Sequence, residues 1–190
     1  MTTQQGASPG ARIEQAKSRY DRLTIALHWL TAALVIALFA LAETWSFFPR
    51  DIRKLGQSLH ISLGLLLTAV LIVRLVWRGS RGRRLPPAAS GLQHWAAKAA
   101  HHALYALLAA QVVLGFLYRW AQGEPFLFFG LFAVPSPVAI DPGMEQVFGG
   151  LHNDVAWIVI ILAGLHAAAA LLHHHVLRDG VLRRMLPGRT

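Results

Sequence analysis

Four long apolar segments alternate with polar and basic connections along the 190-residue chain. They cover about residues 23–42, 60–77, 101–118 and 152–172. Each is close to the roughly 20 residues that a helix needs to cross a hydrocarbon core. Leu, Ala, Val and Ile dominate them, and the two-residue alternation of strands is absent, so each is predicted to be a helix. The pattern predicts an all-α fold, an integral membrane four-helix bundle in which residues 1–190 form a single domain.

The connections differ in charge, and this difference predicts the orientation. Most of the 18 Lys and Arg residues lie in the polar segment 1–22, beside or within the second connection (78–91), or after residue 177. Because positive residues stay on the cytoplasmic side, both termini are predicted to be cytoplasmic and the protein to lie in a bacterial inner membrane. The polar tail 1–19 has no pattern of a cleaved signal peptide, so the first helix is expected to be a retained anchor.

The third connection, about residues 119–151, is the longest and contains the run EPFLFFGLFAVPSP. Its aromatic and proline residues predict a segment at the membrane interface rather than a fifth span. The first connection, residues 43–59, carries Arg50, Arg53 and Lys54. These cations bind an anionic group of a cofactor on the outer side, attract a small anion, or belong to a solvated loop.

The composition limits the class of protein, the cofactors and the partners that the chain can have. Hydrophobic residues make up 55% of the chain and charged residues 14%, against about 25% charged residues in soluble proteins. With no cysteine, disulfides, thiolate-bound iron–sulfur clusters and covalently attached heme are excluded. The basic residues flank apolar spans instead of forming a phosphate-binding face, so no nucleic-acid partner is expected.

Four histidines within the apolar segments fall at two depths. His60 and His152 begin their segments on the outer side, whereas His28 and His166 lie toward the cytoplasmic side. His152 and His166 are 14 residues apart, which places them on one helix face about 21 Å apart. Each level receives two imidazoles from two helices, the ligand set of a six-coordinate b-type heme held between helices.

Small residues one turn beyond each of these histidines would leave room for a porphyrin, namely Ala32, Gly64, Ala156 and Ala170. Two alternatives remain: the histidines form hydrogen bonds between helices, or the chain is a metal carrier. A zinc site needs three or four converging ligands. Depth places only two at each level, unless His101 or His102 joins the inner pair.

Arg74 lies inside the second apolar segment, 14 residues after His60 and on the same helix face. It should reach the inner pair, where it would bind an inner heme propionate, an anion that needs a partner away from water. The alternative is an arginine whose head extends to the cytoplasmic interface.

Five motifs together resemble the bacterial cytochrome b-561 family, and within it the four-helix di-heme superoxide oxidases. They are RYDRLTIALHWL (19–30), SLHISLG (58–64), VRLVWR (73–78), LHNDVA (151–156) and GLHAAAALLHH (164–174). The resemblance implies two non-covalent b hemes, one ligated by His60 and His152 and the other by His28 and His166. It also implies that superoxide is oxidised to oxygen at the outer face and that ubiquinone is reduced, with protons from the cytoplasmic side.

The predicted function is therefore that of a superoxide:ubiquinone oxidoreductase with no obligate protein partner. The alternative is a heme b membrane subunit that passes electrons between quinone and a partner dehydrogenase or hydrogenase. His173 lies seven residues beyond His166 on the same face, about 10 Å nearer the cytoplasm. Because imidazole titrates near neutral pH, His173 is a candidate proton donor to quinone, or only the polar end of its helix. His174 and His175 are expected to face headgroups or solvent.

Overall fold

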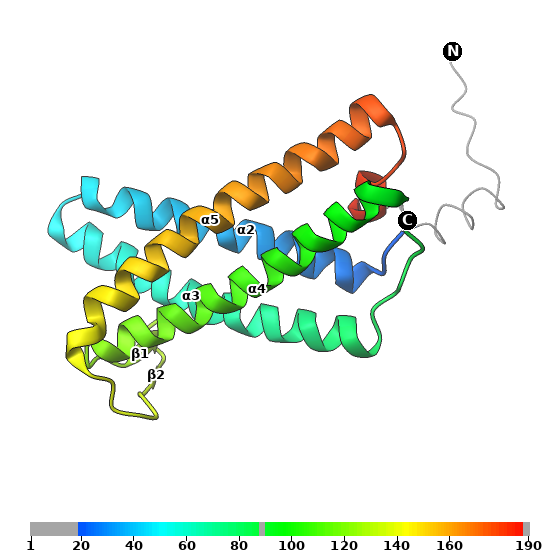
Figure 1. Cartoon of the computed structure of the whole chain (residues 1–190). Helices are drawn as coiled ribbons and strands as arrows, with labels where there is room; N and C mark the ends of the chain where they lie inside the picture. The colour runs from blue at the N-terminus through cyan, green and yellow to red at the C-terminus, as the bar shows by residue number, and fades with distance from the viewer. Residues whose placement is uncertain (1–18, 88–89, 188–190) are drawn as a thin grey trace, which may run out of the picture.

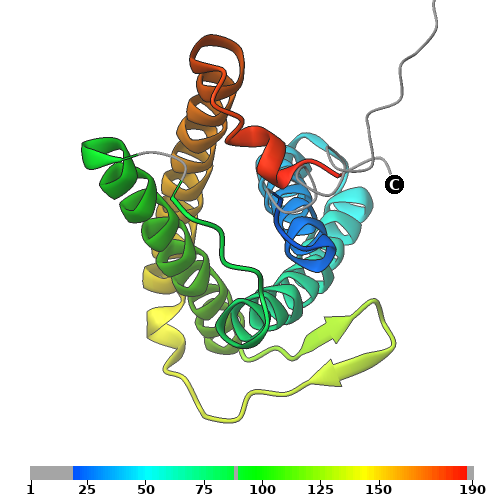
Figure 2. The same cartoon turned by 90° about the vertical axis from the view of Figure 1, so that its right-hand side faces the viewer.

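The computed structural model describes residues 19–87 and 90–187. Its main elements are the helices α2 (Arg22–Thr44), α3 (Arg50–Ser80), α4 (Gly91–Ala121) and α5 (Glu145–Leu172). They run alongside one another in an elongated bundle (Figures 1 and 2), in which α2 packs mainly on α3 and α4 mainly on α5. All four are long and apolar enough to cross a membrane. The predicted all-α membrane bundle is confirmed.

The helices extend beyond the apolar segments that predicted them. Pro49 stands at the N-cap of α3, so His60 lies ten residues inside this helix instead of at its start. The predicted first connection is accordingly mostly helical after Pro49, and Arg50, Arg53 and Lys54 lie in its first turns. α5 likewise begins seven residues before His152. Hydropathy marks only the lipid-crossing part of a helix, whereas capping residues and proline decide where it starts.

The third connection folds into a short antiparallel hairpin, which the sequence did not predict. Its strands are β1 (Phe126–Phe128) and β2 (Phe132–Val134). Phe129 and Gly130 both have positive φ, 48° and 73°, and Leu131 N donates to Phe128 O over 2.8 Å. Positive φ at both central residues suits the twist of a hairpin. Phe126 is buried, and its ring centroid lies 4.7 Å from that of Phe116 on α4.

Ser62 fastens this hairpin to α3. Its side chain is completely buried; Oγ donates to Leu127 O over 3.2 Å and accepts from Phe129 N over 2.9 Å. Outer residues of the hairpin remain exposed, with Leu131 at 77%. The apolar outer part of the hairpin agrees with the expected position at the membrane interface.

Two small clusters of buried apolar side chains hold the helices together. The first joins α2 to α3 through Leu27, Leu34, Leu38, Leu67 and Val70. The second joins α3, α4 and α5 through Leu71, Leu108 and Val159. Many large apolar side chains elsewhere on the helices are exposed, as expected where lipid replaces water as the surrounding medium.

Four short helical segments complete the described elements: the 3-10 helices η1 (Trp45–Phe47), η2 (Pro142–Met144) and η4 (Leu182–Met185), and the π-helical turn η3 (His173–Leu177). At η4 the two ends of the described chain meet, because Tyr20 N donates to Arg184 O over 3.1 Å and Trp29 Nε1 donates to Met185 O over 2.8 Å. The hairpin lies at the opposite end of the bundle (Figure 1). Below, the end with Tyr20 and Arg184 is called the inner end and the hairpin end the outer end.

Asp21 ties the inner end together. Its carboxylate caps α2 by accepting from Thr24 N and Thr24 Oγ1 over 2.8 and 2.7 Å. It also accepts from Trp77 Nε1 and Arg83 N, each over 3.0 Å. Partial burial raises the pKa of Asp21, but the hydrogen bonds from Thr24, Arg83 and Trp77 outweigh it and hold this pKa well below its usual range. One ionised side chain thus joins α2, α3 and the connection after α3.

Candidate functional site

His60 of α3 and His152 of α5 form the outer pair. Their ring centroids are 6.2 Å apart and the ring planes are inclined by 75°. His60 Nδ1 donates to Leu38 O over 3.1 Å, and His152 Nδ1 donates to Gln111 O over 3.2 Å. A backbone carbonyl that holds Nδ1–H fixes the tautomer and leaves Nε2 as the nitrogen that can bind a metal.

α4 shapes the surroundings of His152 through two residues that sequence reasoning missed. A Cβ added at Gly115 would stand 3.1 Å from His152 Cε1, so a larger residue would displace this ring by a few tenths of an ångström. Gln111 Nε2 donates to His152 Nε2 over 3.2 Å, while its Oε1 is buried without a partner among the described residues. A glutamine within an apolar span is itself a signal of function, and this signal was available in the sequence.

His28 of α2 and His166 of α5 form the inner pair, with ring centroids 6.4 Å apart and planes inclined by 72°. Arg74 reaches this level, as its place in α3 predicts. Its Nη2 donates to His28 Nδ1 over 3.2 Å, and its guanidinium lies 5.0 Å from the ring centroid of Tyr105. The inner pair is therefore accompanied by a cation inside the membrane span.

His101 also approaches the inner pair, the possibility that the spacing left open. Its ring centroid is 5.2 Å from that of His166, and its Nδ1 donates to Ala97 O over 2.6 Å. His102 makes the same bond one residue later, to Lys98 O over 2.7 Å. Among the residues that the structure describes, however, no group of three or more His, Asp or Glu side chains could hold a metal ion. A carrier site with converging ligands therefore has no support in the described ranges.

The distances within the two pairs fit a metal held between two imidazoles. A metal bonded at about 2.1 Å to a ring nitrogen lies about 3.2 Å from the ring centroid, so two imidazoles on opposite sides of it have centroids about 6.4 Å apart. The outer and inner pairs, at 6.2 and 6.4 Å, meet this condition. His101 and His166, at 5.2 Å, are too close. The geometry thus favours His28 over His101 as the partner of His166.

The helix surface is open at Gly64, beside the outer pair. A Cβ added at Gly64, one turn beyond His60, would meet no atom within 4 Å. Neutral nitrogen ligands from two helices, with their tautomers set by backbone carbonyls in the outer pair, suit a low-spin heme iron. The residues present therefore fit two b-type hemes, one at each pair.

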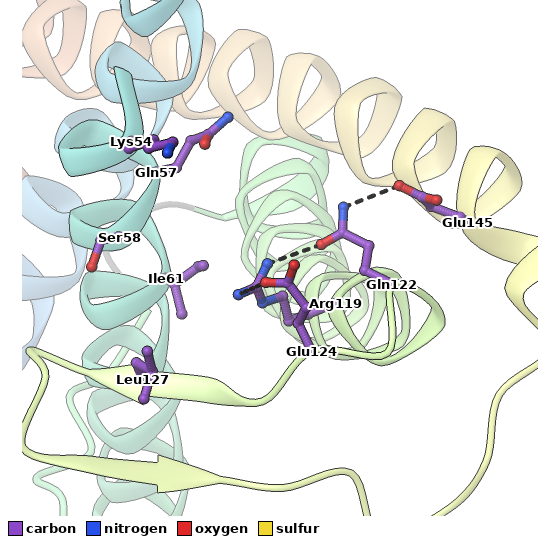
Figure 3. Close-up of a pocket in the computed structure, with 9 residues that line it drawn as sticks. All are labelled: Lys54, Gln57, Ser58, Ile61, Arg119, Gln122, Glu124, Leu127 and Glu145. Carbon is purple, nitrogen blue, oxygen red and sulfur yellow. Dashed lines mark hydrogen bonds and ion pairs between the residues drawn. The ribbon is translucent and has the colours of Figure 1, made fainter. Parts of the chain in front are cut away.

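A polar pocket of about 580 Å³ opens at the outer end, between α3, α4, the start of α5 and the hairpin (Figure 3). The residues that line it are Lys54, Gln57, Ser58, Ile61, Arg119, Gln122, Glu124, Leu127 and Glu145. Ser58 and Ile61 flank His60 in sequence, so the pocket lies against the part of α3 that carries the outer pair. Of the three cations in the predicted first connection, only Lys54 lines it.

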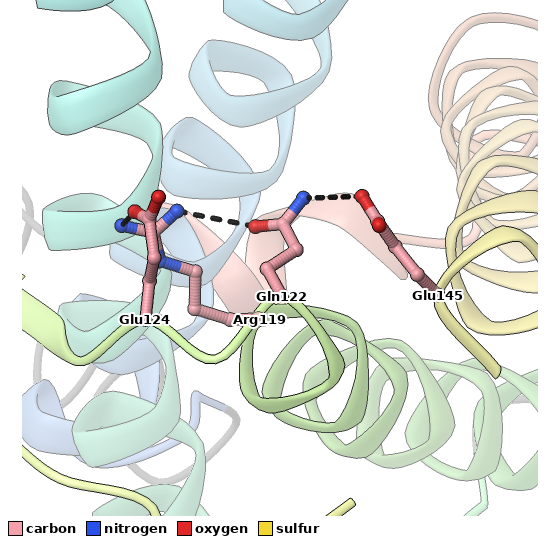
Figure 4. A network of polar contacts seen from close by, with 4 residues as sticks. All are labelled: Arg119, Gln122, Glu124 and Glu145. Carbon is pink, nitrogen blue, oxygen red and sulfur yellow. Dashed lines mark hydrogen bonds and ion pairs between the residues drawn. The ribbon is translucent and has the colours of Figure 1, made fainter. Parts of the chain in front are cut away.

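A chain of polar contacts crosses this pocket (Figure 4). Arg119 Nη2 pairs with Glu124 Oε2 at 2.5 Å, and Arg119 Nη1 donates to Gln122 Oε1 over 3.1 Å. Gln122 Nε2 in turn donates to Glu145 Oε1 over 3.2 Å. The carboxylates of Glu124 and Glu145 thus balance the positive charges of Lys54 and Arg119. An anion could therefore be attracted only to one side of the pocket and not to the pocket as a whole.

The histidine run after the inner pair divides in two. His173 begins a π-helical turn, η3 (His173–Leu177), and its Nδ1 contacts Asp179 Oδ2 directly. His174 and His175 pack on each other, with ring centroids 4.8 Å apart, and have no contact with the inner pair among those observed. The structure therefore separates His173 from its two neighbours.

Two stacked imidazole pairs between membrane-crossing helices define a class of protein, the membrane-bound b-type cytochromes. The profile of the prokaryotic cytochrome b561 family matches residues 19–188, and the chain belongs to this family. The resemblance seen in the motifs is thereby confirmed. The protein is a multi-pass bacterial membrane protein that binds b-type heme and transfers electrons.

Curated relatives cover nearly the whole chain. It is 39% identical over 173 residues to cytochrome b561 homolog 2 of Escherichia coli K12, which covers 88% of this chain and 91% of that protein. It is 30% identical over 174 residues to the probable superoxide oxidase CybB of Yersinia pestis, at 89% and 96% coverage. It is also 30% identical over 179 residues to cytochrome b561 homolog 1 of E. coli K12, at 90% and 99% coverage.

Proposed function

We propose that this cytochrome holds two b hemes, one between His60 and His152 and one between His28 and His166, and oxidises superoxide with ubiquinone as acceptor. The observation that carries the proposal is the pair of centroid distances, 6.2 and 6.4 Å, at two levels of one bundle. When bound, hemes at these pairs would supply one-electron transfer across the membrane. The likeness to the probable superoxide oxidase of Y. pestis supports superoxide as the donor.

Two imidazoles at each site also limit the chemistry. A heme held by both imidazoles of a pair would have no position left for an oxygen species, so superoxide would give up its electron without binding to the metal. Two superoxide ions then lose one electron each and become two O₂. One ubiquinone gains these two electrons and two protons and becomes ubiquinol. This balance requires no further oxidant or reductant.

At the outer end, the pocket between α3 and α4 is the proposed route for superoxide. It lies against the turn of α3 that carries His60, and Lys54 lines it without an acidic partner among the observed ion pairs of the described residues. Arg119, in contrast, is paired with Glu124. Lys54 is thus the cation that would attract a small anion toward the outer pair.

At the inner pair, Arg74 is proposed to bind a heme propionate. It now donates to His28 Nδ1, which can accept only while this nitrogen carries no proton. An imidazole bound to a metal through Nε2 carries its proton on Nδ1. Binding through Nε2 would therefore release Arg74, and since no Asp or Glu of the described residues pairs with it, a heme carboxylate would supply the opposite charge.

Protons for ubiquinol are proposed to come from the inner end through His173. With both termini cytoplasmic in a bacterial inner membrane, as the charge distribution predicts, His173 would lie on the cytoplasmic side of the inner pair. An imidazole can hold and release a proton near neutral pH, and His173 follows His166 by two turns on the same helix face.

Purified protein in liposomes that contain ubiquinone tests the proposal. A steady enzymatic source of superoxide should produce ubiquinol in proportion to superoxide consumed, at a ratio of one to two, and superoxide dismutase should abolish the signal. Lys54→Gln should slow the reaction, and this loss should shrink at high salt because salt screens the charge. Ubiquinol formation only after addition of a dehydrogenase or hydrogenase would instead support the role of a partner subunit.

A further inference from the structure

The C-terminal end of α5 bends back onto itself. After Leu172 the helix widens into the π turn η3, and Arg178 then adopts a left-handed conformation with φ of 54°. Asp179 N donates to the carbonyl of His173 over 3.3 Å and closes the turn. Arginine rarely takes a positive φ, and single π turns often occur at functional sites. The result of this turn is that Asp179 lies against His173.

The carboxylate of Asp179 is held at both oxygens. Oδ2 contacts His173 Nδ1 directly, and Oδ1 accepts from Val181 N over 3.1 Å. The hydrogen bond from His173 holds the pKa of Asp179 below its usual range, so the group is ionised at neutral pH. A carboxylate accepts but does not donate, so it keeps a proton on Nδ1 and makes Nε2 the nitrogen that exchanges protons.

The other charged residues that the sequence places in this turn and in η4 are arginines. η4, which packs against η3, carries Arg183 and Arg184, and Arg184 Nη1 donates to Pro86 O over 2.7 Å. Arg178 lies in the turn itself. Asp179 is the only acidic residue of the chain after Asp154. His173 and Asp179 therefore form an acid–base pair within a basic segment. The His173 side chain is 21% exposed and the Asp179 side chain 27%.

We propose that Asp179 is the positioning residue that makes His173 the proton donor to ubiquinone. The carboxylate holds Nδ1–H, and the protonated ring gives the proton on Nε2 to the reduced quinone and regains one from water at the inner end. Each ubiquinone takes up two such protons together with two electrons, one from each of two superoxide ions, and becomes ubiquinol. The inference rests on the proposed function, because it assumes that quinone is reduced near the inner pair.

A purely structural role for Asp179 makes a different prediction. Asparagine keeps the backbone bond to His173 O and a side-chain oxygen for Val181 N, so the turn should survive Asp179→Asn. What it loses is the charge and the constraint on the imidazole tautomer. Asp141 provides a matched control, since its Oδ1 likewise caps a turn by accepting from Gly143 N over 2.9 Å, in η2 near the outer end.

The test uses the full, heme-loaded chain in liposomes with ubiquinone, reduced by superoxide. We expect Asp179→Asn to slow quinone reduction about tenfold at pH 7.5 and to change the pH dependence of the rate, because the imidazole loses the carboxylate that holds its Nδ1 proton. Asp179→Glu should restore most of the rate. Asp141→Asn should leave both rate and profile unchanged, and heme spectra should be the same in all variants.

A second readout separates this inference from the proposed function. Imidazole ¹⁵N shifts of His173 should report a proton on Nδ1 in the wild type and a mixture of tautomers in Asp179→Asn. If Asp179→Asn keeps the wild-type rate and pH profile, or if wild-type His173 carries its neutral proton on Nε2, the inference is wrong. If the wild type reduces no ubiquinone at all, the proposed function fails, and the ¹⁵N shifts alone then decide whether Asp179 sets the tautomer.

Discussion

His60 and His152 face each other across the bundle with ring centroids 6.2 Å apart, and each ring is oriented by a backbone carbonyl of a different helix. α2 supplies one of these carbonyls, Leu38 O, and α4 the other, Gln111 O. All four helices therefore contribute to the outer pair, although only α3 and α5 provide its imidazoles. A heme held there would depend on the packing of the whole bundle and not only on two side chains.

Gly115 is expected to be essential for the outer heme. Its replacement by alanine would place a Cβ 3.1 Å from His152 Cε1, so the ring would have to shift by a few tenths of an ångström from the position in which it donates to Gln111 O. We expect Gly115→Ala to weaken heme binding at the outer pair about tenfold or more, a loss typical of changes that disturb metal-ligand orientation. Gly79→Ala is the control, because a Cβ at Gly79 meets nothing within 4 Å. Equal heme content in the two variants would contradict this view of Gly115.

Arg74 should set the potential of the inner heme. Reduction adds an electron, and a nearby cation stabilises the reduced state, so Arg74→Leu should lower the midpoint potential. A tenfold change in the one-electron equilibrium corresponds to about 59 mV, which is the size of shift we expect. Arg78→Leu, four residues later, removes a charge that stacks instead on Tyr20, with Arg78 Cζ 5.6 Å from the ring centroid, and should change the potential much less. A redox titration that shows no difference between Arg74→Leu and the wild type would refute the assignment.

Asp21 should stabilise the inner end in a pH-dependent manner. Loss of a capping carboxylate typically costs about 1–2 kcal/mol, so Asp21→Ala should lower the free energy of unfolding by this amount at pH 7. The pKa of Asp21 is lower in the folded state than its ordinary value of 3.8. Its contribution is therefore complete above pH values near this ordinary value and is lost as the pH falls further.

Thermal unfolding in detergent from pH 7 down to pH 3 checks this behaviour of Asp21. The difference between wild type and Asp21→Ala should be constant in the upper part of the range and should narrow in the most acidic samples. A difference that grows on acidification would contradict the assigned sign of the pKa shift.

The membrane bundle and the depth of its histidines could be read from the sequence because both depend on simple periodicity. A spacing of 14 residues places His152 and His166 on one face of any α-helix. The same spacing separates Arg74 from His60 and predicts that Arg74 lies near the inner level. The same reasoning assigned His28 to the inner level but left open whether His101 joins it. Hydropathy alone gives depth but not distance, and this choice depends on a difference of about one ångström between ring centroids.

Other features depend on contacts that leave little trace in composition. The hairpin forms because Ser62, 67 residues before Phe129, accepts its backbone N–H, and no local pattern reveals such a bond. The contact between His173 and Asp179 requires a π turn and a left-handed arginine, which no propensity would predict. Gln111 was visible as a polar residue in an apolar segment, but its two bonds to His152 are set by the packing of α4 on α5.

Heme content and spectra of single histidine variants test the central claim most directly. The wild type should bind two low-spin b hemes per chain. His60→Ala and His152→Ala should each lose the same heme, His28→Ala and His166→Ala should each lose the other, and His101→Ala should keep both. One heme per wild-type chain, or loss of a heme in His101→Ala but not in His28→Ala, would contradict the two imidazole pairs as heme ligands.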